Sequence, residues 1–151
     1  MYYALSELAL HPDVQEELYR EVQTVCGDEP PRYHDLINLI YTQCIMYETM
    51  RLHPIIGSLW LTVAGANDET ILNGKYPIPQ TSTVGMDFYN VHRNEKYWGP
   101  DADKFVPSRF DNRKASPGSN EYCPDGRFRM PVRDAFFGFG DGPRTCLGMT
   151  N

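Results

Sequence analysis

A cysteine stands inside a glycine-rich loop close to the end of the printed sequence. The stretch FGDGPRTCLG runs from Phe139 to Gly148 and contains Cys146. Glycines permit tight backbone turns and let a flat ligand approach the main chain closely. A cysteine in this setting can ligate a metal, act as a nucleophile, or be a small buried structural residue. On residue types alone, these three interpretations stay open.

A second group of charged side chains lies well upstream of the loop. Glu48 and Arg51 are three positions apart, so they share one face if the segment is helical. Ile45, Met46 and Met50 lie around them and indicate that much of this helix is buried. The plainer interpretation is an exposed surface ion pair, worth well under about 1 kcal/mol.

Length and composition limit the classes of protein that this sequence can represent. The chain has 151 residues, the length of one ordinary domain, and 41% of them are hydrophobic, which is enough to build a core. Its net charge of -6 argues against nucleic-acid binding through general phosphate attraction. We find no secretory signal and no apolar run long enough to span a bilayer. The four cysteines show neither a C-x-x-C pair nor a histidine at zinc-finger spacing. A chain of this size does not need disulfide bonds, so we expect reduced thiols, with disulfide pairing as the alternative.

Three helical segments are expected to position the charged pair. Residues 1–10 resemble the last turns of a helix that begins upstream of Met1. Residues 12–26 predict a second helix, because Pro12 suits the first helical position and acidic residues follow it. A third helix is expected over 35–52, ending before Pro54 because a residue that precedes proline avoids helical angles.

The second half of the chain is expected to be less regular. Short strands are predicted within 56–86, at residues 60–63, 75–78 and 83–86, joined by turns rich in glycine, asparagine and proline. Residues 87–138 predict a short helix followed by aromatic and proline-rich coil. This coil leads into the cysteine loop at 139–148.

Three motifs follow one another in a fixed order: ETMR at 48–51, FVPSRF at 105–110 and FGDGPRTCLG at 139–148. Together they resemble the E-x-x-R, F-x-P-x-R-F and F-G-x-G-x-R-x-C-x-G motifs of the cytochrome P450 monooxygenases. The resemblance covers essentially the whole chain. It implies a mainly α fold with a small segregated β-sheet. Residues 1–151 would then be the C-terminal part of a single catalytic domain, incomplete at both ends.

The resemblance implies that the glycine-rich loop binds haem b. Cys146 would be the catalytic residue and the axial ligand of the haem iron, because a thiolate donor favours O–O bond cleavage. His92 in NVHRNEKYW is a further candidate for a haem propionate, the alternative being a capping or surface histidine. The other residues that the resemblance assigns to the cofactor are Phe139, Gly140, Gly142, Arg144 and Gly148, with Arg144 on a propionate.

By the same resemblance, Glu48, Arg51 and Arg109 form a buried charge triad that holds the coil before the cysteine loop against the third helix. Burying charges costs solvation, so such a network must be closely hydrogen-bonded. Two positions depart from the family pattern. Ser108 replaces an acidic residue, and Thr62 stands where many members carry a propionate-binding arginine.

The implied reaction inserts one atom of O2 into a small, apolar organic substrate, with electrons from NAD(P)H through a reductase. Residues 55–61 would approach the substrate. Arg127, Arg129 and Arg133 would attract an acidic electron donor, or would serve solubility alone. The resemblance places the protein at the cytosolic face of the endoplasmic reticulum membrane, held by an anchor upstream of this chain. The sequence leaves two alternatives open, a catalytically silent truncated product and a different haem-thiolate protein such as a peroxide isomerase or a sensor.

Overall fold

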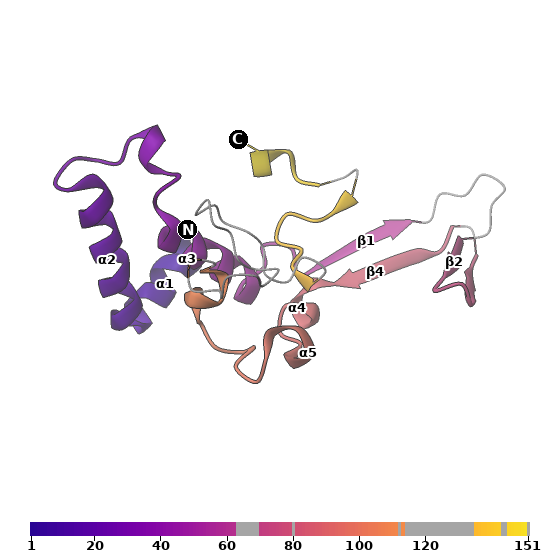
Figure 1. Cartoon of the computed structure of the whole chain (residues 1–151). Helices are drawn as coiled ribbons and strands as arrows, with labels where there is room; N and C mark the ends of the chain where they lie inside the picture. The colour runs from indigo at the N-terminus through magenta and orange to yellow at the C-terminus, as the bar shows by residue number, and fades with distance from the viewer. Residues whose placement is uncertain (63–69, 80, 112, 114–134, 143–144, 151) are drawn as a thin grey trace.

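The computed structural model describes residues 1–62, 70–79, 81–111, 113, 135–142 and 145–150 (Figure 1). Three longer helices come first: α1 (Tyr2–Leu10), α2 (Pro12–Cys26) and α3 (Ile40–Leu52). The strands are β1 (Ser58–Thr62), β2 (Thr70–Leu72), β3 (Tyr76–Ile78) and β4 (Thr83–Asp87). The described residues also form α4 (Phe88–Val91), α5 (Glu95–Trp98) and the 3-10 turns η1 (Tyr33–Asp35), η2 (Pro107–Phe110) and η6 (Leu147–Thr150).

Figure 1 shows α1, α2 and α3 at one end of the molecule, with the β1–β4 ribbon projecting from the other. The strands form two small antiparallel sheets, one from β1 and β4 and one from β2 and β3. In the first sheet the register runs from Ser58 opposite Asp87 to Thr62 opposite Thr83. The expected mainly α fold with a small, separate β part is therefore confirmed, although the β part is two sheets.

The β2 strand was not predicted, because its three residues are too few to show an alternating pattern. It forms by pairing with β3 across a turn in which Asn73 and Gly74 both have positive φ, 53° and 66°. Asparagine and glycine are the residues that tolerate this conformation in tight hairpin turns.

The third helix begins at Ile40, so the predicted start at residue 35 is wrong. Asp35 instead closes the 3-10 turn η1, where its Oδ2 accepts a hydrogen bond of 2.8 Å from the amide of Arg32. The first turn of α3 is capped from α2. The Glu21 carboxylate accepts hydrogen bonds from the amides of Tyr41 at 2.7 Å and Thr42 at 2.9 Å. Such a cap satisfies amides that have no partner inside a helix, and it cannot be found from local sequence.

The other end of α3 is also held by a distant side chain. Arg93 Nη2 donates a hydrogen bond to the carbonyl oxygen of Leu52, the last residue of the helix. A cation at this position is favourable because the carbonyl end of a helix carries partial negative charge. Both ends of α3 therefore depend on side chains from other segments.

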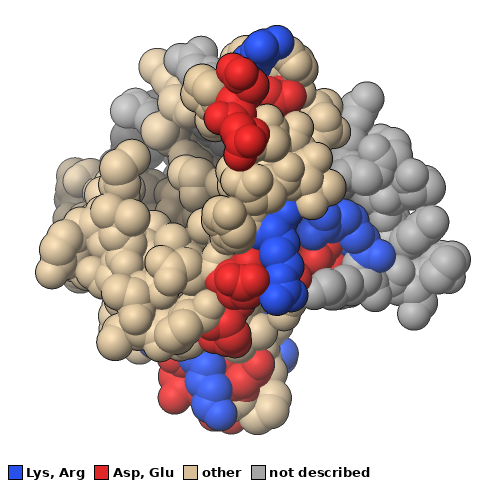
Figure 2. Space-filling view, turned by 90° about the vertical axis from the view of Figure 1, so that its left-hand side faces the viewer, with Lys and Arg blue, Asp and Glu red and all other residues tan. Residues whose placement is uncertain are grey.

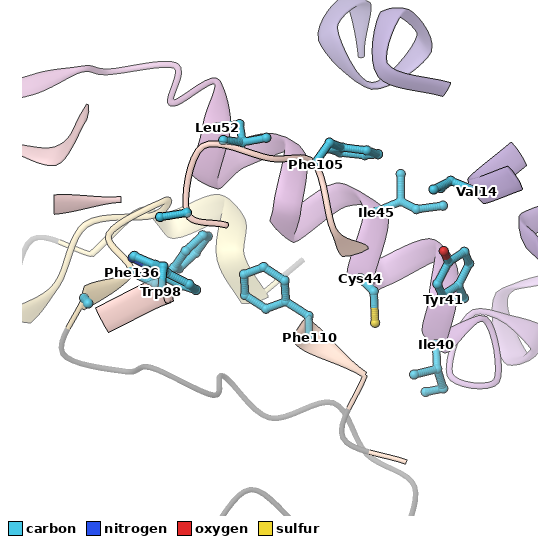
Figure 3. Packing of buried hydrophobic residues seen from close by; sticks show 12 residues of the cluster. Val14, Ile40, Tyr41, Cys44, Ile45, Leu52, Trp98, Phe105, Phe110 and Phe136 are labelled. Carbon is cyan, nitrogen blue, oxygen red and sulfur yellow. The ribbon is translucent and has the colours of Figure 1, made fainter. Parts of the chain in front are cut away.

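The buried core surrounds α3. Figure 3 shows Phe110, Trp98 and Phe136 gathered beside the helix, with Val14 of α2 near Ile45 and Tyr41. These aromatic rings come from α5, η2 and the segment that precedes the cysteine loop. The core thus fastens the coil before the cysteine loop to the helix that carries Glu48 and Arg51.

The outer face of α2 is charged. Figure 2, which views this side of the molecule, shows acidic and basic side chains lying next to each other. Glu16 and Arg20 form an exposed ion pair there, with Arg20 Nε 3.1 Å from Glu16 Oε1. Within the described part of the chain, every helix is too short or too polar to cross a membrane.

Candidate functional site

Glu48 and Arg51 form a fully buried ion pair on α3, rather than a surface pair. Both side chains are 0% exposed. Arg51 Nε lies 2.7 Å from Glu48 Oε2, and Arg51 Nη2 donates to Glu48 Oε1 at 2.8 Å. Two parallel hydrogen bonds between a guanidinium and a carboxylate give the strongest geometry available to such a pair.

The remaining donors of Arg51 point to main-chain oxygens of the coil. Nη1 donates to the carbonyl oxygens of His92 at 2.6 Å and Ala102 at 2.5 Å, and Nη2 donates to that of Lys104 at 3.0 Å. All the N–H groups of this guanidinium are therefore used, which is what a buried arginine requires. The Arg51 guanidinium also lies 5.1 Å from the centre of the Trp98 ring.

Arg109 of η2 completes the network from the other side. Its Nε donates to Glu48 Oε1 at 3.0 Å, and the amide of Val106 donates to the same oxygen at 2.8 Å. Nη1 and Nη2 of Arg109 donate to the carbonyl oxygens of Trp98 and Asp101, each at 3.1 Å. The structure thus brings Glu48, Arg51 and Arg109 together, and their hydrogen bonds hold the coil against α3.

Cys146 is exposed and is a free thiol. Its amide donates to the carbonyl oxygen of Phe139 at 2.9 Å, which closes the loop between them. Gly140 and Gly142 have φ of +74° and +71°, and a Cβ added to either would meet no atom of the described residues within 4 Å. A Cβ added to Gly148 would lie 3.7 Å from the Cys146 sulfur.

This loop suits a flat, sulfur-ligated group such as haem. Cys146 is exposed, and among the described residues no side chain occupies the space beside Gly140 and Gly142. An aromatic macrocycle needs such a flat approach to the main chain. Phe139 is partly buried, and its ring packs edge-on against Tyr47 of α3 at 6.4 Å. Arg144, which was predicted to contact a propionate, lies outside the described residues, as do Arg127, Arg129 and Arg133.

His92 is fully buried, so it is not a surface histidine. Its Nε2 accepts a hydrogen bond of 2.8 Å from the amide of Phe137. The ring stacks on Phe136 at 5.2 Å and 13°. Burial, together with the nearby charges of Arg51 and Arg93, lowers the pKa of His92 to about 4. Nδ1 is buried without a hydrogen-bond partner among the described residues.

A further cluster was missed by sequence reasoning. Glu7 of α1 lies between two histidines, with Oε1 2.6 Å from His53 Nε2 and Oε2 3.4 Å from His11 Nδ1. The ring of Tyr3 stacks on that of His53 at 4.5 Å. The cluster joins α1 to the end of α3. Glu7 and His11 are four positions apart, but His53 lies 46 positions from Glu7, so its contact could not be predicted from spacing.

Comparisons with known proteins agree on one family. The family model described as "Cytochrome P450" matches residues 1–150. The chain is 34% identical to human "Cytochrome P450 3A5" over 97% of its own length and 26% of that protein. It is 31% identical to "Bifunctional cytochrome P450/NADPH--P450 reductase 2" of Bacillus subtilis over 97% of its own length and 12% of that protein. "Cytochrome P450 750A1" of Pinus taeda is 33% identical, with 97% and 26% covered.

The chain therefore spans about a quarter or less of the length of these three relatives. Within that span, the family match extends over all three motifs, the buried network around Glu48 and the exposed thiol of Cys146. This chain belongs to the cytochrome P450 family.

Proposed function

We propose that this chain provides the haem-thiolate side of a monooxygenase. The observation that carries the proposal is the exposed free thiol of Cys146 in a loop whose glycines leave open space beside the backbone. Haem b, when bound, supplies the chemistry that activates O2 for transfer of one oxygen atom to an organic substrate. Cys146 would hold the iron, with Phe139, Gly140, Gly142, Arg144 and Gly148 forming the cradle.

The residues of the chain have separate roles in this proposal. Cys146 binds as a thiolate, and Phe139 limits the access of water to the sulfur from the α3 side, where it packs on Tyr47. Glu48, Arg51 and Arg109 do not contact the cofactor in this proposal. They hold the coil in place, so that the loop that follows it has one position.

The proposed electron source is NAD(P)H through a reductase. One relative, from Bacillus subtilis, carries both names, cytochrome P450 and NADPH–P450 reductase, in a single chain. Arginines ahead of the cysteine would attract an acidic donor, so charge reversal at Arg129 and Arg133 should slow haem reduction at low salt. Unchanged reduction kinetics would count against this docking role.

The substrate is proposed to be small and apolar, and the segment offered to it is the stretch after α3. Ile55 is 91% exposed and Ile56 is 58% exposed, so both side chains are available to other groups. We also propose, on the basis of the family resemblance, that the full-length protein lies at the cytosolic face of the endoplasmic reticulum membrane. Cell fractionation with an antibody to the full-length protein tests that location.

The spectrum of the reduced, carbon-monoxide-bound protein tests the central proposal. The full-length protein should give a thiolate-type Soret band, and Cys146→Ser should lose it while retaining its far-UV circular dichroism. Cys26→Ser is the matched control, since Cys26 lies at the end of α2 and should be neutral. A thiolate-type band in Cys146→Ser would contradict the assignment.

A further inference from the structure

His92 contacts two parts of the site through two different groups. Its main-chain oxygen accepts a hydrogen bond from Arg51 Nη1 at 2.6 Å, and its ring Nε2 accepts one from the amide of Phe137 at 2.8 Å. The first contact belongs to the charge network on α3. The second lies just before Phe139, where the cysteine loop begins. One residue therefore joins the charge network to the loop.

A short series of main-chain hydrogen bonds continues from that contact to the cysteine. The carbonyl oxygen of Phe137 accepts from the amide of Gly140 at 3.0 Å, and that of Phe139 accepts from the amide of Cys146 at 2.9 Å. If the amide of Phe137 moves, the turn that it starts moves with it. The position of Cys146 is thus coupled to the Phe137 amide through the loop's own backbone.

The histidine ring is held in a fixed orientation. It stacks on Phe136 at 5.2 Å and 13°, and on Phe88 of α4 at 6.4 Å and 15°. Phe88 in turn stacks on Phe137 at 5.4 Å and 15°. Aromatic contacts of this kind fix the plane of a ring, and here that plane points Nε2 at the Phe137 amide.

The hydrogen bond sets the protonation state of the ring. Because the Phe137 N–H donates, Nε2 must carry a lone pair, and the proton of the neutral imidazole must sit on Nδ1. An imidazolium would place an N–H against the Phe137 N–H and would lose the contact. The charged groups that act on the ring are Arg51 and Arg93, and both cations oppose protonation. His92 is therefore a neutral acceptor near neutral pH.

We propose that His92 is a positioning residue for the Cys146 loop, and that it acts by accepting the Phe137 amide hydrogen bond at Nε2. This inference rests on the proposed function of Cys146. It differs from a direct contact of His92 with a haem propionate, because that contact would have to use Nδ1. The two roles therefore assign the function to different nitrogens of the same ring.

Amide side chains can separate the two nitrogens in the full-length, haem-loaded protein. The oxygen of a glutamine can replace Nε2 as an acceptor, whereas the shorter asparagine can replace only Nδ1. His92→Phe keeps an aromatic ring for stacking but has no acceptor. If His92 positions the loop, His92→Gln should keep the thiolate-type Soret band. His92→Asn and His92→Phe should release haem roughly tenfold faster, the effect of one lost buried hydrogen bond.

Hydrogen exchange gives a readout that does not depend on haem activity. The peptide that contains Phe137 should lose protection roughly tenfold in His92→Phe and His92→Asn, and should keep it in His92→Gln. In the unmodified protein, protection of the same peptide, corrected for the intrinsic rate, should fall as pH decreases toward about 4, where the ring gains its proton. That pH step should be absent in His92→Gln. The titration of the unmodified protein can be measured without any variant, so the inference can still be tested if the substitutions prevent folding.

Two results would overturn the inference. Retention of haem by His92→Asn but not by His92→Gln would assign the role to Nδ1 and thus to a propionate contact. Equal haem retention and equal protection in all three variants would show that the Phe137 contact does not hold the loop. Neither result would affect the Cys146 assignment, which depends only on the Cys146→Ser spectrum, so the two proposals can fail separately.

Discussion

Replacing Glu48 by alanine should remove the capacity of the full-length protein to bind haem, because it disconnects the coil from α3. The carboxylate accepts four hydrogen bonds: from Arg51 Nε at 2.7 Å, Arg51 Nη2 at 2.8 Å, Arg109 Nε at 3.0 Å and the Val106 amide at 2.8 Å. Among the described residues, its removal leaves the fully buried guanidinium of Arg51 without a counter-charge, and it leaves Arg109 with Asp101 alone, whose Oδ2 lies 3.3 Å from Arg109 Nη2.

The expected loss of stability can be worked out from these contacts. Breaking a buried ion pair by removing one partner costs about 3–5 kcal/mol. Leaving the Val106 amide without an acceptor adds about 1–3 kcal/mol. The sum, about 4–8 kcal/mol, is comparable to the whole free energy of unfolding of a typical domain, about 5–15 kcal/mol. Glu48→Gln should be milder, because its amide oxygen still accepts hydrogen bonds.

Chemical denaturation and the reduced carbon-monoxide spectrum measure the two parts of this prediction. The matched control is Glu16→Ala on α2, which removes a Glu–Arg pair whose side chains are 56% and 73% exposed. An exposed pair of this kind contributes about 0–1 kcal/mol, so Glu16→Ala should bind haem normally. A Glu48→Ala protein with an unchanged midpoint of unfolding and a full thiolate-type Soret band would refute the reasoning.

Three further predictions follow from packing, thiol burial and protonation. Gly138→Ala should destabilise the protein by roughly 1–3 kcal/mol, because its Cβ would lie 2.6 Å from the ring of Phe136, which is 7% exposed. Gly85→Ala is the control: its Cβ would lie 2.6 Å from the ring of Trp60, but Trp60 is 67% exposed and its ring can move aside. Gly85→Ala should therefore lower the free energy of unfolding by less than about 0.5 kcal/mol, measured by chemical denaturation. Equal destabilisation by the two substitutions would contradict this prediction. In the native protein without haem, iodoacetamide should label Cys146 but not Cys44, because burial raises the pKa of the Cys44 thiol to about 12. Peptide mass spectrometry measures the labelling of both cysteines. Labelling of Cys44 at the same rate as Cys146 would be inconsistent with the burial of Cys44. Folding lowers the pKa of His92 from 6.5 to about 4, so between these pH values the unfolded chain binds a proton that the folded protein does not. The free energy of unfolding should therefore decrease by about 3 kcal/mol as the pH falls from about 7 to about 4. The His92→Gln protein should lack this contribution.

The sequence predicted those features that depend on local pattern. The helix at 12–26 is α2 as predicted, because its proline start and its acidic first turn are local signals. The strands near residues 60, 76 and 84 were also found from β-branched residues between turns. The grouping of Glu48, Arg51 and Arg109 was expected from the resemblance of their motifs and not from spacing alone, since Arg109 lies 61 positions from Glu48.

Contacts between distant segments could not be predicted. The true start of α3 depends on Glu21, which lies in another helix, so local sequence placed that start too early. His92 was considered for its side chain as a propionate contact. Its burial and its bond to Phe137 arise from the stacking of aromatic rings across α4 and the segment before the loop. Neither feature leaves a periodic trace in the sequence, because each depends on tertiary packing.

The Glu48–Arg51 ion pair is enclosed by residues that are synthesised much later, and this has a consequence during synthesis on the ribosome. Glu21 is made before the helix, but the carbonyl groups that satisfy Arg51 belong to residues as far as Lys104, and Arg109 comes later still. At about 5–20 residues per second, the 61 positions between Glu48 and Arg109 take about 3–12 s to translate. During that interval the nascent helix carries an ion pair that its final partners do not yet enclose. Pauses in translation between these positions should therefore lengthen the time for which the emerging chain is open to chaperones and proteases.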